Sequence, residues 1–155
     1  YEISCSLVGS EMCIRDSPFS TAKNAVNFAG IVAMNYLQGD YEQVPMTCVR
    51  ELVEQKAIII DVRGKKAFDD AHIKGAVNIP LDELRERINE IPRDCPVYIH
   101  CRTSWNSYYA IRALKGYGYN NIINIQGSFL GLSYFEYFND MTTGRESILT
   151  NYNFN

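Results

Sequence analysis

The stretch VYIHCRTSWNSYYAIRALKG, residues 97–116, decides the fold class. Its first four residues form an apolar run of strand length, and residues 105–115 carry apolar side chains at helical spacing. The segment therefore predicts a strand that runs into a helix, with Cys101 at the junction. We expect the helix to end at Gly116 or Gly118.

Strands and helices alternate on both sides of this stretch. The expected strands lie at residues 57–61, 76–79 and 121–125, and the expected helices at residues 81–91 and 129–138. The first of these strands, AIIID, is a continuous apolar run, which is typical of a strand buried on both faces. The alternation predicts an α/β fold, with a parallel sheet of about four to five strands flanked by helices on both faces.

The chain has 155 residues, enough for one ordinary domain with extra segments at its ends. We place that domain at residues 44–140, followed by a loose polar tail at residues 141–155. Residues 1–17 lack periodicity and resemble translated adapter sequence, so an artefact or a disordered leader is expected there. In residues 18–43 the apolar side chains recur at spacings of three and four, which predicts one amphipathic helix.

Two details of the amino-terminal half can be tested directly. The amphipathic helix should run from Thr21 to Leu37 and stop at Gly39. Residues 39–46 are expected to form a connector, after which Thr47 should cap a short helix.

Composition excludes several classes of protein. The net charge is -3, from 15 basic and 18 acidic residues, and the basic residues are scattered, so neither nucleic acid nor a membrane surface is an expected partner. No apolar run approaches the roughly 18 residues that span a bilayer, and no secretory signal is visible. Five cysteines without a repeated short spacing argue against disulfides or a zinc site, so we expect reduced thiols, no metal and a cytoplasmic location.

Cys101 is the candidate nucleophile. In parallel α/β sheets reactive groups gather at the carboxyl ends of strands, where the N–H groups of a following helix favour an anion such as a thiolate. The same amides would stabilise a persulfide anion after sulfur capture. The residues of this expected anion cradle follow the cysteine: Arg102, Thr103, Ser104, Trp105, Asn106 and Ser107. Placement alone leaves open the alternative that Cys101 is a small buried hydrophobic residue, as we expect for Cys48 and Cys95.

Two segments resemble rhodanese domains. The run IIIDVRGKKAFDDAHIKGAVNIPL, residues 58–81, resembles their DVR…F…GHI-x-GA-x-NIPL stretch, and HCRTSWNSYYAIRAL, residues 100–114, resembles their active loop and the helix after it. The resemblance covers roughly residues 46–138. It implies a small parallel sheet with flanking helices, and transfer of sulfane sulfur through a persulfide on Cys101.

The resemblance also assigns supporting residues. Asp61 and Arg63 match the DVR positions, where they would form an ion pair or organise the loop near the site. His72 matches the histidine of the GHI motif and is expected to be a packed, hydrogen-bonded residue rather than a base; alanine replaces the glycine before it.

Arginine is missing from two informative places. Active rhodaneses commonly carry one five residues after the cysteine, where it holds an anionic donor such as thiosulfate, but this chain has Asn106. Phosphatases of the same fold carry one a residue later, at the place of Ser107, so phosphate-ester chemistry is not expected. A persulfide or protein-bound sulfur suits this site better than thiosulfate, and Arg102 would substitute for the missing cation only in part.

A second resemblance concerns the segment before the domain. AKNAVNFAGIVAMNYLQGDYEQV, residues 22–44, resembles the end of the dimerisation domain of coenzyme A-disulfide reductase-type oxidoreductases, some of which end in a rhodanese domain. An ordinary amphipathic helix is the alternative. The resemblance implies a homodimeric parent with upstream oxidoreductase domains, which would bind FAD and NAD(P)H and act on a coenzyme A disulfide or persulfide. This chain has no G-x-G-x-x-G motif, so no cofactor is expected in it.

Two main hypotheses therefore remain, and a phosphatase is a third that the missing arginine disfavours. The first is a sulfurtransferase or persulfide carrier, whose partner is a sulfane-sulfur donor or coenzyme A persulfide. The second is a non-catalytic module of rhodanese fold that serves as a docking or regulatory surface, which the asparagine at position 106 motivates.

Overall fold

The structure is a computed structural model that describes residues 25–154. These residues divide into two units, one up to Asp40 and one from Tyr41, each of which is described by itself. The leader expected at residues 1–17 lies outside the described residues. No helix in residues 25–154 is both long enough and apolar enough to cross a membrane.

The first unit contains helix α2 (Ala25–Leu37), which confirms the expected helix over the part that is described. Its end is closed by Gly39, whose φ of 72° is the left-handed conformation that glycine adopts at low cost. The amides of Gly39 and Asp40 donate to the carbonyls of Tyr36 and Asn35, which satisfies two carbonyls of the last helical turn.

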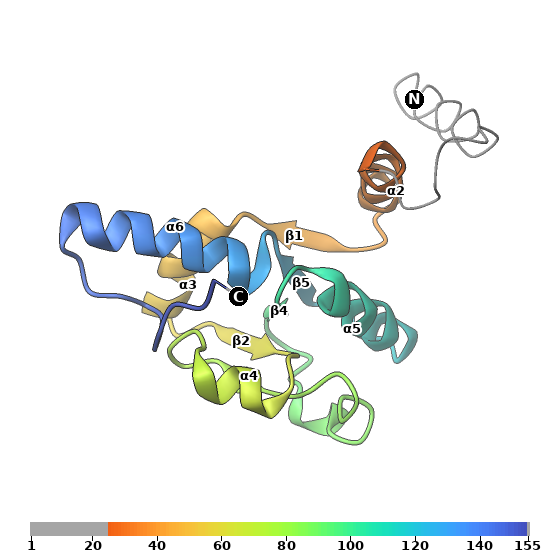
Figure 1. Cartoon of the computed structure of the whole chain (residues 1–155). Coiled ribbons are helices and arrows are strands. Elements are labelled where there is room, and N and C mark those ends of the chain that lie inside the picture. The colour runs from red at the N-terminus through yellow and green to blue at the C-terminus, as the bar shows by residue number, and fades with distance from the viewer. Residues whose placement is uncertain (1–24, 155) are drawn as a thin grey trace. The chain divides into compact units, whose positions relative to one another are not determined.

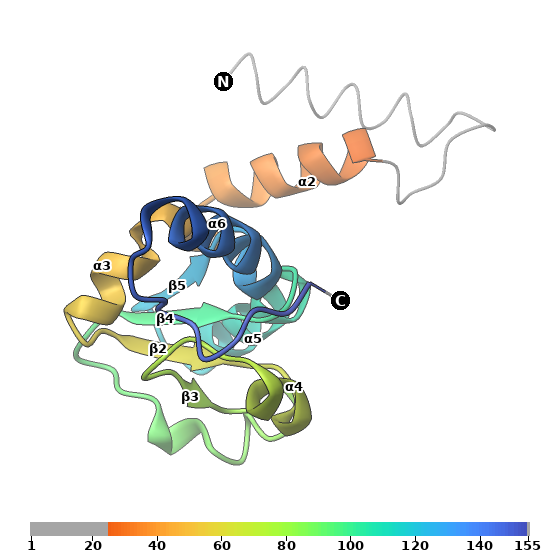
Figure 2. The same cartoon turned by 60° about the vertical axis from the view of Figure 1, so that its left-hand side comes forward.

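The second unit is built on five parallel strands, and this confirms the expected α/β fold with its parallel sheet (Figures 1 and 2). Their order across the sheet is β1-β5-β4-β2-β3. The strands are β1 (Glu42–Val44), β2 (Ile58–Asp61), β3 (Val77–Asn78), β4 (Val97–His100) and β5 (Ile122–Ile125). The remaining elements are η1 (Met46–Cys48), α3 (Val49–Glu54), α4 (Lys65–Asp70), η2 (Ile88–Glu90), α5 (Trp105–Gly116) and α6 (Ser128–Thr143).

Helices cover both faces of the sheet, as Figure 2 shows. Successive side chains of a strand point to opposite faces, so Ile59 and Ile60 of β2 enter two different buried clusters. On one face the cluster includes side chains of α5, among them Ile111 and Leu114. On the other face it includes side chains of α3 and α6, such as Leu52 and Phe129. Burial on both faces explains why the strands read as continuous apolar runs.

The connector expected at residues 39–46 contains strand β1, which pairs with β5 at the edge of the sheet. The prediction missed this strand because it is only three residues long. The compact unit therefore begins at Tyr41, whose side chain is 6% exposed, rather than at residue 44. The expected cap at Thr47 is wrong as well, because Thr47 lies inside η1 and the residue before α3 is Cys48.

The helix expected at residues 81–91 is also wrong. This segment consists of turns and the short helix η2. Its backbone is held mostly by bonds of the i to i−3 type, such as those from Glu86 to Glu83 and from Ile91 to Ile88, with a single i to i−4 bond from Arg87 to Glu83. The apolar residues are nevertheless buried, since Leu84 is 1% and Ile91 3% exposed. Spacings of three and four bury one side of such turns as well as one side of an α-helix, so the pattern alone does not separate them.

Residues 141–155 do not form the loose tail that the sequence predicted. Helix α6 continues to Thr143, and Ile148 and Leu149 are buried in the core. Leu149 forms an antiparallel bridge with Ile73, and the amide of Lys74 donates to the carbonyl of Ile148. Burial of Ile148 and Leu149 thus anchors this otherwise polar segment beside residues 73–74.

Candidate active site

Strand register brings polar residues together at the carboxyl edge of the sheet. Asp61, the last residue of β2, pairs with Asn78 of β3 on one side and with His100 of β4 on the other. Cys101 comes directly after His100 and is followed within four residues by α5. The junction of strand and helix is where the sequence predicted it.

The loop after Cys101 is attached to the start of α6. The carbonyl oxygens of Cys101 and Arg102 accept hydrogen bonds of 3.0 Å from the amides of Phe129 and Leu130. The amide of Cys101 donates to the hydroxyl of Ser128 over 3.4 Å. Two consecutive backbone bonds fix the course of the chain, so the position of Cys101 depends on β5 and α6 as well as on its own strand.

Ser104 turns the loop into α5. Its φ of 71° is positive, which is uncommon outside glycine, and its carbonyl accepts the first bond of the helix, from the amide of Tyr108. Its hydroxyl lies 2.9 Å from that of Ser128. The first amides of α5 have no acceptor within the helix, as in every α-helix, and the helix begins four residues after Cys101.

Other residues of the expected cradle have different surroundings. Ser107 is fully buried, and its hydroxyl donates to Asn124 over 2.8 Å, which attaches α5 to β5. Arg102, Thr103 and Asn106 are exposed, and Trp105 is 51% exposed. The hydroxyl of Ser107 therefore serves packing, and only the backbone of that residue remains a candidate for anion binding.

Cys101 itself is 2% exposed and belongs to the buried cluster on the α5 face of the sheet. The sequence left open whether Cys101 is a reactive thiol or a small buried hydrophobic residue. Its position at the carboxyl edge of the sheet fits the first, and its burial in the core fits the second. It is a free thiol, as are Cys48 and Cys95.

Asp61 and Arg63 form a buried ion pair next to this loop. Asp61 is fully buried and Arg63 is 7% exposed, and Nη2 of Arg63 lies 2.6 Å from Oδ2 of Asp61. The guanidinium also donates to the carbonyl of Ala71 and lies 3.9 Å from the ring centroid of Phe129. Arg63 thus connects the end of β2 to the residue whose amide holds Cys101.

His100 is a candidate that sequence reasoning missed. It is fully buried, its Nδ1 lies 3.2 Å from the carbonyl oxygen of Cys101, and its ring stacks on Phe129. Burial lowers its pKa from the ordinary value of 6.5, against the opposite effect of the Asp61 carboxylate. Nε2 lies 3.8 Å from Asp61 and has no hydrogen-bond partner among the described residues. A histidine just before the cysteine was the available signal.

His72 lies elsewhere in the unit. Its ring stacks on Phe68, and Nδ1 is 2.8 Å from the carbonyl oxygen of that residue. Its backbone exchanges hydrogen bonds with Thr150 of the carboxyl-terminal segment. The structure therefore brings together Asp61, Arg63 and the Cys101 loop, whereas the contacts of His72 attach the carboxyl-terminal segment.

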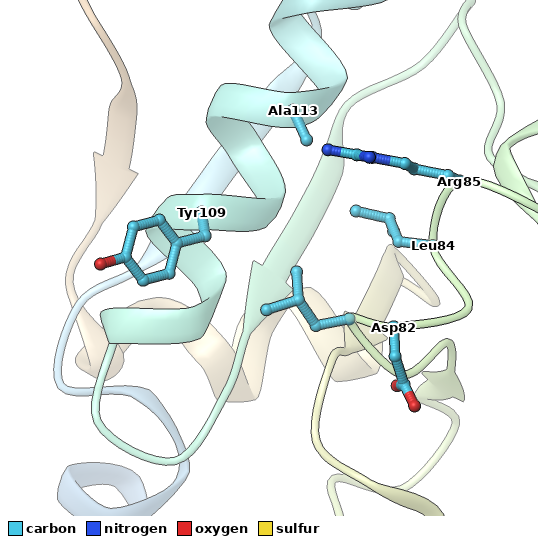
Figure 3. A pocket seen from close by; sticks show the side chains of 6 residues that line it. Asp82, Leu84, Arg85, Tyr109 and Ala113 are labelled. Atoms are coloured by element: carbon cyan, nitrogen blue, oxygen red, sulfur yellow. The ribbon is translucent and has the colours of Figure 1, made fainter.

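Two pockets lie near this region. A pocket of about 330 Å³, the α5 pocket, is lined by Leu81, Asp82, Leu84, Arg85, Tyr109 and Ala113 (Figure 3). A smaller one of about 190 Å³, the loop pocket, is lined by Arg63, Ala67, Asp70, Arg102, Phe129, Leu130 and Asn153. Of these two pockets, the loop pocket is the one that includes residues of the candidate site, namely Arg63 and Arg102. In the described part of the chain, no group of three or more His, Cys, Asp or Glu residues could hold a metal ion.

Comparisons with known proteins agree with this geometry. Residues 46–133 match the family model described as Rhodanese-like domain. The protein YqhL of Bacillus subtilis is 45% identical over 75 residues, which are 48% of this chain and 60% of YqhL. The thiosulfate sulfurtransferase GlpE of Pseudomonas syringae is 28% identical over 90 residues, which are 58% of this chain and 85% of GlpE.

Two solved structures are similar over more of the chain. Reduced CoADR-RHD of Bacillus anthracis is 32% identical with a TM-score of 0.69, and the match covers 84% of this chain and 25% of that one. An NAD-dependent persulfide reductase from A. fulgidus is 33% identical with a TM-score of 0.59, over 72% of this chain and 19% of that one. This chain therefore spans a quarter or less of the length of both proteins.

Proposed function

Because the chain belongs to the rhodanese-like domain family, we propose that it accepts, carries and transfers sulfane sulfur as a persulfide on Cys101. The observation that carries the proposal is the position of Cys101, between the carboxyl end of β4 and the first turn of α5. Free amides and the positive end of a helix favour both a thiolate and a persulfide anion at this place. Sulfurtransferases among the similar proteins support the same kind of chemistry.

The proposed reaction has two balanced steps. The thiolate of Cys101 attacks the outer sulfur of a donor R–S–S⁻, so that a bond from Sγ to that sulfur forms, the bond within the donor breaks, and R–S⁻ leaves. An acceptor thiolate then attacks the outer sulfur, and the thiolate of Cys101 is regenerated. Each step moves a negative charge along the sulfur atoms, which fixed donors stabilise without reorganisation.

The residues around Cys101 position it for these steps. The bonds from Phe129 and Leu130 hold the loop, while Arg63, which is paired with Asp61, packs against the ring of Phe129. Because Asn106 stands where thiosulfate-using rhodaneses carry arginine, we propose a persulfide rather than thiosulfate as the natural donor.

We also propose that the chain works as the carboxyl-terminal part of a larger reductase for coenzyme A disulfide or coenzyme A persulfide. The support is its similarity to CoADR-RHD and to the NAD-dependent persulfide reductase, both several times longer. The upstream domains would bind FAD and NAD(P)H and form a homodimer, in a compartment that keeps thiols reduced, the cytoplasm. Coding sequence upstream of Thr21 tests this directly, because nucleotide-binding G-x-G-x-x-G motifs are expected there.

A second candidate function is a non-catalytic module that docks partners through the rhodanese fold. The 2% exposure of Cys101 favours it, because reactive cysteines are typically at least partly exposed and buried ones are typically inert. The two candidates differ in one measurable property, which is the uptake of sulfur by the folded chain.

Cyanolysis after exposure to glutathione persulfide makes that measurement. We expect the wild-type chain and Cys95→Ser to release thiocyanate, and Cys101→Ser to release roughly a hundredfold less or none. Circular dichroism checks that all three are folded. Equal release from Cys101→Ser and wild type would remove the catalytic role of Cys101, and no release from folded wild type would favour the docking module.

A further inference from the structure

The loop pocket shares its wall with the loop of Cys101. Arg102 is the next residue in the chain, and the amides of Phe129 and Leu130, which line the pocket, hold the carbonyls of Cys101 and Arg102. Arg63, from the turn after β2, also lines the pocket. The pocket therefore lies beside the loop that follows Cys101 at the carboxyl edge of the sheet.

Two cations line this small pocket. Arg63 is 93% buried, and its described hydrogen bonds to Asp61 and Ala71 use Nε and Nη2. In the described part of the chain Nη1 donates no hydrogen bond, and the side chain of Arg63 lines the pocket. Arg102 is exposed and forms no ion pair among the described residues. Asp70 supplies one carboxylate against these two guanidinium groups.

We propose that the loop pocket binds an oxyanion group carried by the sulfur donor, held by Arg102 and by Nη1 of Arg63. This inference deepens the proposed function and rests on it. Guanidinium groups bind carboxylate, sulfonate and phosphate through paired N–H donors. About 190 Å³ is room for such a group with a short carbon chain, so the substrate class is a small anionic persulfide or the anionic end of a larger one.

The carboxyl-terminal segment forms the outer wall of the same pocket. Asn153 lines it, and the segment is fixed by the bond from the amide of Thr150 to the carbonyl of His72 and by the bond from the hydroxyl of Tyr152 to Asp140. The pocket therefore depends on contacts that His72 makes far from Cys101 in the sequence.

A matched pair of donors tests the proposal on the full chain. The persulfide of 3-mercaptopropionate carries a carboxylate, and the persulfide of 3-mercaptopropionamide has nearly the same shape without the charge. The measured quantity is the ratio of the two rates of sulfur loading, taken from quenched samples by mass spectrometry. A third donor is thiosulfate, which transfers its outer sulfur and leaves as sulfite. It tells whether the pocket accepts an oxyanion bonded directly to the transferred sulfur, or only one on the organic group of a persulfide.

Substitution of Arg102 or Asp70 should change that ratio in a defined direction. Wild type should prefer the carboxylate donor, and Arg102→Gln should lower the preference by roughly five- to tenfold. Asp70→Asn should raise it, because a repelling charge is removed. Arg85→Gln is the matched control, since this exposed arginine lines the α5 pocket instead, and it should leave the ratio within about twofold of wild type.

The outcomes separate this inference from the proposed function. Loss of the preference for the carboxylate donor in Arg102→Gln supports the loop pocket. Slower loading of Arg102→Gln from thiosulfate supports it as well. Sulfur loading with a ratio that Arg102→Gln leaves unchanged, or that only Arg85→Gln lowers, overturns the inference and leaves the proposed function standing. Absence of loading from every donor on the folded wild-type chain overturns the proposed function, and the inference with it.

Discussion

The two ends of strand β4 carry two cysteines in contrasting surroundings. At the amino end, Cys95 is partly exposed, and the side chain of Asn121 donates to the carbonyls of Pro92 and Cys95. At the carboxyl end, Cys101 is buried beside three ionisable residues, Asp61, Arg63 and His100, all of them buried as well. The amino end thus uses ordinary hydrogen bonds to the backbone, whereas the carboxyl end contains groups whose burial costs free energy.

The contrast indicates where function constrains the sequence. Buried ion pairs are often no more stable than apolar residues of the same size, so stability alone does not explain them. Reactive groups of parallel sheets lie at the carboxyl edge, and Asp61, Arg63 and His100 lie at that edge too. Two other buried carboxylates, Glu136 and Asp140, lie in α6, where they pair with Arg50 and Arg145. Three predictions test the comparison, in order of decreasing effect.

The largest effect is expected from the buried ion pair. Asp61→Asn leaves the charge of Arg63 buried without a charged partner, so the free energy of unfolding should fall by about 3–5 kcal/mol. Asn121→Ala, at the other end, removes two hydrogen bonds to carbonyls and should cost only about 1–3 kcal/mol. Urea denaturation of both variants gives the two values. Equal losses would mean that the two ends do not differ in the way described.

The next effect concerns the pH dependence of stability. Because burial lowers the pKa of His100, the folded chain binds fewer protons at this residue than the unfolded chain does. Its contribution is fully present above pH 6.5 and is lost as the pH falls below that value toward the lowered pKa, by at most about 1.4 kcal/mol per pH unit. His100→Gln should flatten this part of the curve. A slope that survives in the variant would assign the titration to another group.

The smallest effect is expected from Ser128, whose hydroxyl contacts the loop of Cys101. Ser128→Ala removes an acceptor of the Cys101 amide and the partner of Ser104, which should cost about 1 kcal/mol and slow sulfur loading. The control is Ser133→Ala on the same helix, because the hydroxyl of Ser133 is buried without a partner among the described residues. Ser133→Ala should be no less stable than wild type. Loss of stability in Ser133→Ala but not in Ser128→Ala would contradict the role given to the hydroxyl of Ser128.

The sequence predicted the parts of the fold that local patterns determine. The strand at residues 97–100, the helix that follows it and the position of Cys101 between them all depend on an apolar run, a helical spacing and a glycine close together in the chain. The short strand β1 and the turns at residues 81–91 were not predictable in this way. Strand β1 forms because it pairs with β5. The turns at residues 81–91 bury the same apolar side chains that an α-helix would bury.

The site was predicted in part for the same reason. Cys101 follows its strand directly, so its place could be read from one segment. Its supporting contacts come from other segments, namely Ser128 and Phe129 at the start of α6 and Asp61 at the end of β2. Which of these residues meet depends on strand order and register, and a single sequence without an alignment does not determine either.

The location of transferred sulfur tests the central claim most directly. Wild-type chain is exposed to limiting glutathione persulfide, alkylated, digested and mapped by mass spectrometry, so that the extra sulfur is assigned to one of the five cysteines of the chain. The account predicts that Cys101 carries most of the sulfur although it is less exposed than Cys48 and Cys95. Sulfur distributed according to exposure, with Cys95 loaded ahead of Cys101, would contradict it.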